Sequence, residues 1–316
     1  MWRTLLRRAA DAGWRALAPD LPGYGDSEPQ PPHTWERMVD AVDTFHADRE
    51  LGPVALCVHD WGGLIGLRWA CDHGDRVSAL VISGTGFFPD GRWHDVARTM
   101  RTEGQGEELL ARFTRDGFGE LLARLAPGSG AEEADEYFKA FADPVRRAGQ
   151  LELYRSGDFE KLAPYVGRLD ALGVPTLVLW GADDPFAPVA AAHRFAREIP
   201  HARLEVLDGV GHFLFDEQPE RVAAIVVGFL DGLALGQPGS IVNSSMPSET
   251  TIGSLPSARA VMARGASASL VANWAMATLR PPRTPARSRT AAARYATAPI
   301  GAATSPRSAS TSNGGS

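Results

Sequence analysis

Five short apolar runs, each followed by sequence of helical character, constrain the fold of this chain more than any other feature. The runs are bounded by turn residues and cover residues 14–20, 54–60, 77–84, 175–181 and 202–208. Runs of this length without a polar face are typical of strands buried between two layers of helices. Their alternation with helices predicts a mostly parallel sheet covered on both faces, with chemistry at the carboxyl ends of its strands.

The alternation stops between residues 88 and 165, where charge-rich helical segments follow one another. An ordinary crossover connection needs only about a dozen residues, far fewer than this stretch contains. We therefore expect a helical cap placed over the active edge of the sheet. The predicted organisation is a core in two parts, residues 1–87 and 166–235, with the cap at 88–165 between them and a tail at 236–316.

The tail differs from the body in composition and in charge. Residues 236–316 hold too few large apolar side chains to offset the entropy of ordering, so we expect them to be disordered. They carry eight arginines and a single acid, Glu249, so the first 235 residues are more acidic than the net charge of −6 indicates. An acidic body is unsuited to binding nucleic acid, and no motif gives the arginines of the tail a specific partner.

The remaining composition indicates a globular protein. Of the 316 residues, 44% are hydrophobic, which is enough for one large core. No stretch approaches the roughly 18 apolar residues of a membrane span, and the first residues lack the features of a secretory signal, so a cytoplasmic protein without a membrane partner is expected. Cys57 and Cys71 fall in a predicted strand and a predicted helix, which favours buried, reduced thiols. We expect no metal and no cofactor, and the oligomeric state stays open.

The second apolar run ends in a turn that carries an acid. In ALCVHDWGGLIGLRWA, residues 55–70, Gly62 and Gly63 allow the close backbone approach that a sharp strand-to-helix turn needs. Asp60 is therefore expected at the carboxyl edge of the sheet. It is either an exposed nucleophile at a strained turn or an ordinary aspartate at the N-cap of the next helix.

Two later segments favour the nucleophile. In LVLWGADDPFAP a predicted strand ends at Gly181 and two acids follow, Asp183 and Asp184. In LEVLDGVGHFLFDEQPE a predicted strand leads into a glycine-rich loop that carries His212. The order nucleophile, acid, histidine, with each member after a strand, is typical of a catalytic triad built on an α/β sheet.

On these residues the chain resembles the α/β-hydrolases. The likeness covers residues 15–84 and 166–235 and includes APDLPGYGDS at 18–27, a loop that most members share. VHDWGG at 58–63 is similar to the branch with an aspartate nucleophile, in which haloalkane dehalogenases come first and soluble epoxide hydrolases are the next closest. The resemblance implies an α/β-hydrolase fold whose parallel sheet is flanked by helices and interrupted by a helical cap.

The same resemblance implies roles for the three polar residues. Asp60 would displace the leaving group from a carbon atom and form an alkyl ester, and His212 would activate the water that hydrolyses this ester. Related enzymes place the acid that orients the histidine three residues after the glycine, which favours Asp184; Asp183 is the alternative. The expected partners are a small apolar halogenated or epoxide substrate and water.

Two tryptophans bear on the leaving group. The indole NH of Trp61 is a single donor on a large apolar body, which suits a weakly hydrated halide, and haloalkane dehalogenases use a tryptophan here for that purpose. Epoxide hydrolases often carry a tryptophan at this position as well, so Trp61 alone does not separate the two families. Val58 favours a dehalogenase, because epoxide hydrolases usually have glycine at that position. Simple packing is the alternative role of Trp61. Trp93, in the cap, is expected to be the second halide donor or an anchor of the cap.

Aromatic residues near and within the cap keep the epoxide reaction open. Epoxide hydrolases carry a pair of cap tyrosines that protonates the opening oxirane, and this cap contains Tyr137, Tyr154 and Tyr165. Phe87 and Phe88 are expected to line an apolar cavity in either enzyme.

The resemblance also indicates a difference at the start of the chain. In these families, strands and a His-Gly-x-Pro stretch that supplies half of the oxyanion hole precede the helix that the first residues resemble. We expect this chain to lack those strands, and the loss of an oxyanion donor costs about 2.7–4 kcal/mol in related chemistry. A truncated, non-catalytic relative that serves as a binding protein is therefore a third hypothesis. A carboxylesterase is disfavoured because no serine occupies the turn.

Overall fold

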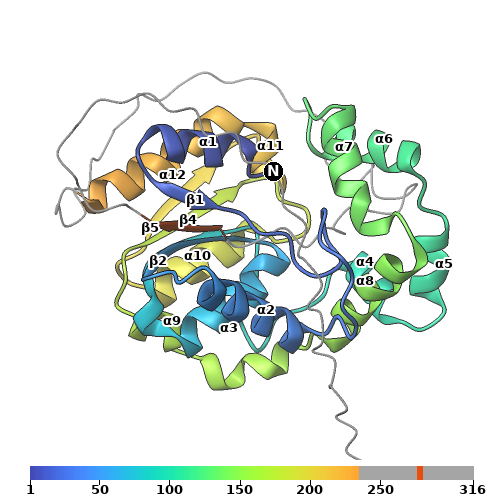
Figure 1. The fold of residues 1–316 in the computed structure, drawn as a ribbon, viewed down its shortest axis with the longest axis horizontal. Helices are drawn as coiled ribbons and strands as arrows, with labels where there is room; N and C mark the ends of the chain where they lie inside the picture. The colour runs from blue at the N-terminus through green and yellow to red at the C-terminus, as the bar shows by residue number, and fades with distance from the viewer. Residues whose placement is uncertain (235–275, 280–316) are drawn as a thin grey trace, which may run out of the picture. The chain divides into compact units, whose positions relative to one another are not determined.

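The computed structural model describes residues 1–234 and 276–279, whose elements are labelled in Figure 1. The strands are β1 (Arg15–Leu17), β2 (Val54–His59), β3 (Val77–Ser83), β4 (Thr176–Gly181), β5 (Arg203–Leu207) and β6 (Met276–Leu279). The helices around the sheet are α1 (Arg3–Asp11), α2 (Trp35–Asp48), α3 (Trp61–Asp72), η1 (Gly74–Arg76), α9 (Arg168–Ala171), α10 (Val189–Glu198), α11 (Leu214–Glu217) and α12 (Pro219–Ala234). β1 to β5 lie within the five apolar runs, which confirms the strands predicted from them.

The strands form one sheet in the order β1-β6-β2-β3-β4-β5. β2, β3, β4 and β5 are parallel to one another, as the alternation with helices predicts. In the register of β2 and β3, His59 lies opposite Ser83, so the chain leaves both strands at the same edge of the sheet. Asp60 and Gly84 are the next residues along the chain, and the candidate active site is built at this edge.

The alternating side chains of β2 show how the sheet is covered on both faces. Leu56 and Val58 point into a cluster formed with α2, α3 and α10. Ala55 and Cys57 point into a second cluster formed with α1 and α12. Successive residues of a strand face opposite ways, so a strand that is apolar at every position has to be covered twice. Cys57 and Cys71 are buried and free, as expected.

β6 comes from the part of the chain that is expected to be disordered. It lies between β1 and β2 and is antiparallel to both. Without a strand in this position, the backbone NH and CO groups on the facing edges of β1 and β2 would have no sheet partner. For residues 276–279 the expectation of disorder is therefore wrong in this structure, because backbone pairing does not require large apolar side chains. Residues 236–275 and 280–316 lie outside the described residues, so the expectation stays a prediction there.

Between β3 and β4, the chain forms helices up to Tyr165 and no strand within the described residues. These are α4 (Asp95–Arg101), α5 (Gln105–Ala111), α6 (Arg115–Leu125), α7 (Ala131–Phe138), η2 (Lys139–Phe141), α8 (Pro144–Ser156) and η3 (Phe159–Tyr165). Ordinary N-terminal signals begin them: the side chain of Thr114 accepts from Gly117 N at 3.2 Å, and Asp143, just before Pro144, accepts from Arg146 N at 2.9 Å. Residues 88–165 are hereafter called the cap.

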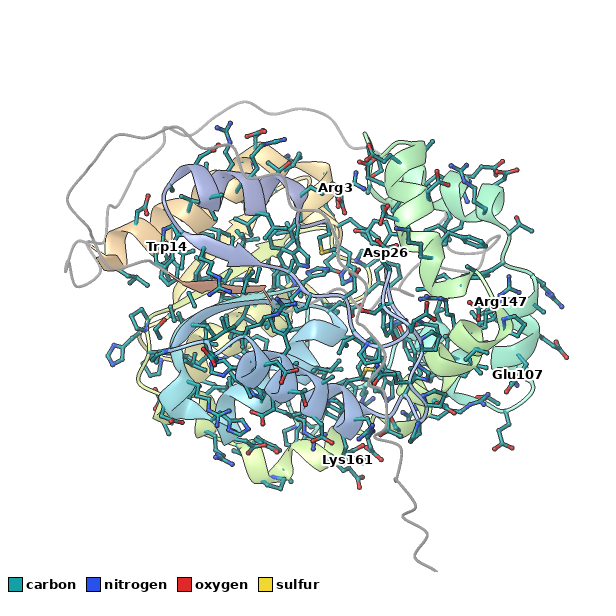
Figure 2. The ribbon with its side chains drawn as sticks, viewed as in Figure 1. Arg3, Trp14, Asp26, Glu107, Arg147 and Lys161 are labelled. Atoms are coloured by element: carbon teal, nitrogen blue, oxygen red, sulfur yellow. The ribbon has the colours of Figure 1, made fainter. Side chains whose placement is uncertain are left out.

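Polar contacts join the cap to the core. Lys139 pairs with Asp26 at 2.7 Å and Lys161 with Glu36 at 2.9 Å; Asp26 and Lys161 are labelled in Figure 2. These pairs are exposed and contribute little, because water screens them. A buried contact ties the same two parts together: the hydroxyl of Tyr24 donates to Gln150 Oε1 at 3.1 Å. Within the described residues, no helix is long and apolar enough to cross a membrane.

Candidate active site

Asp60 occupies a strained turn between β2 and α3. Its backbone has φ 49° and ψ −126°, a region that residues other than glycine rarely adopt and that costs of order 1–3 kcal/mol. The carbonyl of Asp60 accepts from Gly63 N at 2.8 Å and from Thr85 Oγ1 at 2.7 Å, and these bonds hold the turn. Only glycine fits at position 63, because any side chain there would collide with Thr85. The side chain of Asp60 does not accept from the second or third NH of α3, as an ordinary N-cap residue would.

The structure brings the three polar residues of the predicted triad together. His212 Nε2 lies 4.0 Å from Asp60 Oδ2, and His212 Nδ1 lies 2.8 Å from Asp184 Oδ2. The other oxygen of Asp184 accepts from Phe186 N and Ala187 N, each at 2.8 Å. Both of its oxygens are therefore bonded, and the carboxylate holds one orientation toward the imidazole.

The choice between the two neighbouring acids follows from their exposure. Asp184 is buried against His212, whereas the side chain of Asp183 is exposed to solvent. Only Asp184 is placed to orient the histidine. The residue favoured by the resemblance is therefore the one that the turn after β4 directs inward.

Burial and neighbouring charges shift the pKa values of Asp60 and His212. Burial raises the pKa of the Asp60 carboxyl to about 6, although His212 and a hydrogen bond from the backbone NH of Trp61 oppose the rise. Burial alone would lower the pKa of His212, but the carboxylates of Asp184 and Asp60 outweigh it, so the pKa of His212 is raised. The side chain of Asp60 remains 18% exposed, so it is not closed off from solvent.

Trp61, the first residue of α3, lies at the centre of an aromatic cluster. Trp93 stacks on it, with ring centroids 5.5 Å apart and planes inclined by 25°, and Tyr154 packs edge-on at 5.2 Å. Gly157 lies against the same indole, where a Cβ atom would come within 2.5 Å of Trp61 Cη2. The indole NH of Trp61 is buried and has no hydrogen-bond partner among the described residues. A buried donor without a partner is costly, which is typical of a group that receives a ligand.

The other aromatic residues singled out from the sequence fall into two groups. Trp93 and Tyr154 contact Trp61 directly. The hydroxyl of Tyr137 donates to Asp216 and that of Tyr165 to Asp72, so neither faces Asp60. The two phenylalanines after β3 belong to the hydrophobic core, with Phe87 against Tyr165 and Phe88 against Phe195, and their role in lining a cavity stays a prediction.

Sequence reasoning missed two titratable residues beside His212, one buried and one partly buried. The ring of His59 lies 4.5 Å from that of His212, its Nδ1 is 3.2 Å from Ser83 Oγ, and burial lowers its pKa well below the ordinary range. Glu217 Oε2 accepts from Gly211 N at 2.9 Å and so holds the loop that carries His212. His59 stands directly before Asp60 in VHDWGG, and Glu217 follows shortly after His212. Their closeness in sequence to residues of the predicted triad is the signal that could have identified them.

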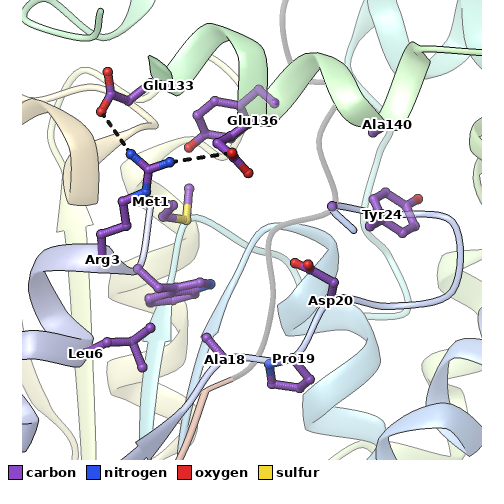
Figure 3. Close-up of a pocket in the computed structure, with 13 residues that line it drawn as sticks. Met1, Arg3, Leu6, Ala18, Pro19, Asp20, Tyr24, Glu133, Glu136 and Ala140 are labelled. Carbon is purple, nitrogen blue, oxygen red and sulfur yellow. Dashed lines mark ion pairs between the residues drawn. The ribbon is translucent and has the colours of Figure 1, made fainter. Parts of the chain in front are cut away.

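A cavity of about 210 Å³ lies at the junction of α1, the loop after β1 and α7. Figure 3 shows Arg3 across it, ion-paired with Glu133 and Glu136, each at 3.7 Å. Tyr24 also lines this cavity, whereas Asp60, Asp184 and His212 do not. Within residues 1–234 and 276–279, no group of His, Cys, Asp or Glu side chains is arranged to hold a metal ion.

Known proteins share this arrangement of elements. The family described as alpha/beta hydrolase fold matches residues 1–219. A haloalkane dehalogenase of Mycobacterium marinum is 29% identical over 72% of this chain and 80% of that protein. Epoxide hydrolase A of Mycobacterium tuberculosis is 30% identical over 74% of this chain and 87% of that protein. The crystal structure of a haloalkane dehalogenase loop variant from Bradyrhizobium elkanii, 26% identical, matches with a TM-score of 0.60 over 74% of this chain and 86% of that one.

Proposed function

This chain belongs to the α/β-hydrolase fold family, and within that family we propose that it cleaves the carbon–halogen bond of small apolar haloalkanes. One observation carries the proposal. At the turn after β2, the Asp60 carboxylate faces His212 Nε2 at 4.0 Å, and the adjacent Trp61 keeps a buried indole NH without a partner in the described part of the chain. The similarity to the haloalkane dehalogenase of M. marinum supports the same reaction.

In the first proposed step, a carboxylate oxygen of Asp60 attacks the carbon atom that bears the halogen. The new carbon–oxygen bond forms as the carbon–halogen bond breaks, and the halogen leaves with the bonding electron pair as a halide ion. The products are an alkyl ester on Asp60 and a halide bound by the indole NH of Trp61. Trp93, which stacks on Trp61, closes the site on the side of the cap.

In the second proposed step, water hydrolyses the ester. His212 Nε2 accepts a proton from water while the water oxygen attacks the carbonyl carbon of the Asp60 ester. The bond to the alkoxy group then breaks, the alcohol leaves with the proton from His212, and the Asp60 carboxyl loses its own proton to solvent. Asp184 keeps the proton of His212 on Nδ1, and the backbone NH of Trp61 stabilises the oxyanion. The net reaction consumes a haloalkane and water and yields an alcohol, a halide ion and a proton.

The proposal is tested by measuring halide release from short bromoalkanes and chloroalkanes. The protein should release bromide and form the matching alcohol, and Asp60→Ala should release none because the attacking oxygen is gone. Asp183→Ala is the matched control, since it removes an exposed carboxylate from outside the site. Absence of halide release from a panel of such substrates would overturn the proposal.

The raised pKa of Asp60 predicts how the reaction depends on pH. Only the carboxylate can attack, so kcat/KM should rise as pH increases through about 6, the pKa of this carboxyl. The pKa of His212 is raised as well. The fraction of neutral His212, the form that accepts a proton from water, therefore also increases as pH rises. Halide release followed from about pH 5 to pH 8 measures the profile. A kcat/KM that is flat or falls over this range would contradict the assignment of Asp60.

Epoxide hydrolysis is the second candidate, and one observation favours it. Tyr154 of the cap packs against Trp61, the residue that follows the proposed nucleophile. The similarity to epoxide hydrolase A of M. tuberculosis supports this reaction as well. An epoxide hydrolase would form a diol from an epoxide and lose most of that activity in Tyr154→Phe. Diol formation without halide release would replace the first proposal with this one.

A further inference from the structure

Arg101 is a cation that neither proposed step uses. It is the last residue of α4 and is partly buried in the cap. Within the described residues, no carboxylate lies within ion-pair distance of it, whereas Arg98 of α4 pairs with Asp95 and Arg155 of α8 pairs with Glu107. Asp158 attracts the guanidinium from beyond that distance, but burial still lowers the pKa of Arg101. A partly buried charge without a close counterion is unfavourable unless another negative group uses it.

Backbone contacts fix the position of the guanidinium group. Its Nη1 donates to the carbonyl oxygens of Tyr154 and Gly157, at the end of α8. α4 and α8 lie side by side in Figure 1 and contact each other. Arg101 therefore holds the end of α8, including the glycine that lies against Trp61, at a set distance from α4.

The guanidinium also lies over an indole. Its Cζ atom is 5.2 Å from the centre of the Trp93 ring, a distance at which a cation is attracted to an aromatic face. Trp93 stacks in turn on Trp61. The three side chains are therefore in contact in the order Arg101, Trp93, Trp61. The indole of Trp61 bears the unpartnered NH next to Asp60. We call these three residues the Arg–Trp–Trp stack.

We propose that Arg101 is a positioning residue for the leaving group, which acts through the Arg–Trp–Trp stack to make the indole NH of Trp61 a stronger halide site. This inference rests on the function proposed above and deepens it. The described body of the protein is acidic, so its field opposes an anion, and Asp60 itself is negative before the displacement. A single cation fixed behind the two indoles offsets part of that repulsion at the place where the halide forms.

Halide binding to the 316-residue protein tests the proposal without turnover. Bromide quenches tryptophan fluorescence, so a titration at constant ionic strength gives its Kd. Arg101→Gln keeps groups that can donate to the two carbonyls but removes the charge, and it should raise the Kd for bromide about tenfold. Arg101→Lys keeps the charge but loses the planar guanidinium, so its Kd should lie between those of the unmodified protein and the glutamine variant. The control is Arg112→Gln, which removes the same charge from a side chain that is 81% exposed, and it should leave the Kd unchanged.

Steady-state kinetics provide a second measurement. The charge should matter more for the poorer leaving group, so Arg101→Gln should lose more kcat/KM with a chloroalkane than with the matching bromoalkane. Loss of packing alone would lower both equally. Equal bromide affinity in Arg101→Gln and the unmodified protein would overturn the inference, and so would a folded Arg101→Lys that binds bromide as poorly as the glutamine variant.

Failure of the inference is distinguishable from failure of the proposed function. If the unmodified protein neither quenches with bromide nor releases halide, the proposed function is wrong and this inference falls with it. If the unmodified protein does both and the Arg101 variants match it, only the role of Arg101 is wrong. Far-UV circular dichroism of each variant shows whether it is folded.

Discussion

Replacing His212 by glutamine should stop the reaction after its first chemical step. The substitution removes the nitrogen that lies 4.0 Å from Asp60 and accepts the proton of water, while the attacking carboxylate remains. Ester hydrolysis should slow by about 10²–10⁴, the usual contribution of a general base. Halide release should then end after one equivalent per protein molecule.

The trapped ester can be measured directly. Intact-protein mass should increase by the mass of the alkyl group less one hydrogen, and peptide mapping should place the increase on Asp60. His201→Gln makes the same change at an exposed histidine and should turn over normally. Repeated turnover by His212→Gln, or an alkyl group found on another residue, would show that this histidine is not the base.

Replacing Asp184 by asparagine should lower kcat nearly as much as His212→Gln does, although the volume of the side chain hardly changes. An oxygen of the amide can still accept from Phe186 N and Ala187 N, but its NH2 group would then face His212 Nδ1. The imidazole would have to carry its proton on Nε2 and could not accept one from water. In a serine protease, the same change of tautomer costs about 10⁴ in kcat, and we expect a loss of that order here.

The adjacent acid provides the matched control for this prediction. Asp183→Asn should leave kcat unchanged, because its side chain is exposed and does not contact the imidazole. The first step should also survive in Asp184→Asn, so a burst of halide followed by slow turnover is expected in stopped-flow measurements. The reverse pattern, with Asp183→Asn inactive and Asp184→Asn active, would reassign the acid.

Much of the fold was predictable because it depends on local sequence. Each of the strands β1 to β5 lies within an apolar run, and strands that are apolar at successive positions have to be covered on both faces. The positions of Asp60 and His212 were predictable for a related reason. Each follows a strand of one parallel sheet, and the carboxyl ends of parallel strands meet at one edge.

The choice between Asp183 and Asp184 shows where local sequence stops being informative. Both follow β4, and the residues alone left both possible until the resemblance favoured one. The turn after β4, whose backbone NH groups at Phe186 and Ala187 bind a carboxylate, directs the second acid inward. The first is left in solvent. Which of two adjacent acids points inward depends on the path of the backbone. Neither the hydropathy nor the type of the two residues predicts that path.

Contacts between distant segments were also beyond the sequence. Three such contacts depend on how the cap and the loops pack. Trp93 stacks on Trp61, and Arg101 contacts both Trp93 and the end of α8. His59 lies beside His212. β6 is the clearest case. Its four residues carry no strong strand signal, and the unpaired edges of β1 and β2 supply the hydrogen-bond partners that make them a strand.

By itself, the sequence determined the layered α/β architecture, the order of the three triad residues and the helical character of the cap, because periodicity and turn residues act over a few positions. Only the tertiary structure decided which acid orients His212, which aromatic rings surround the buried NH of Trp61 and which strand separates β1 from β2. Those outcomes depend on distances between residues that are far apart along the chain. Such distances are fixed by packing and by the need to pair buried polar groups once the chain has folded.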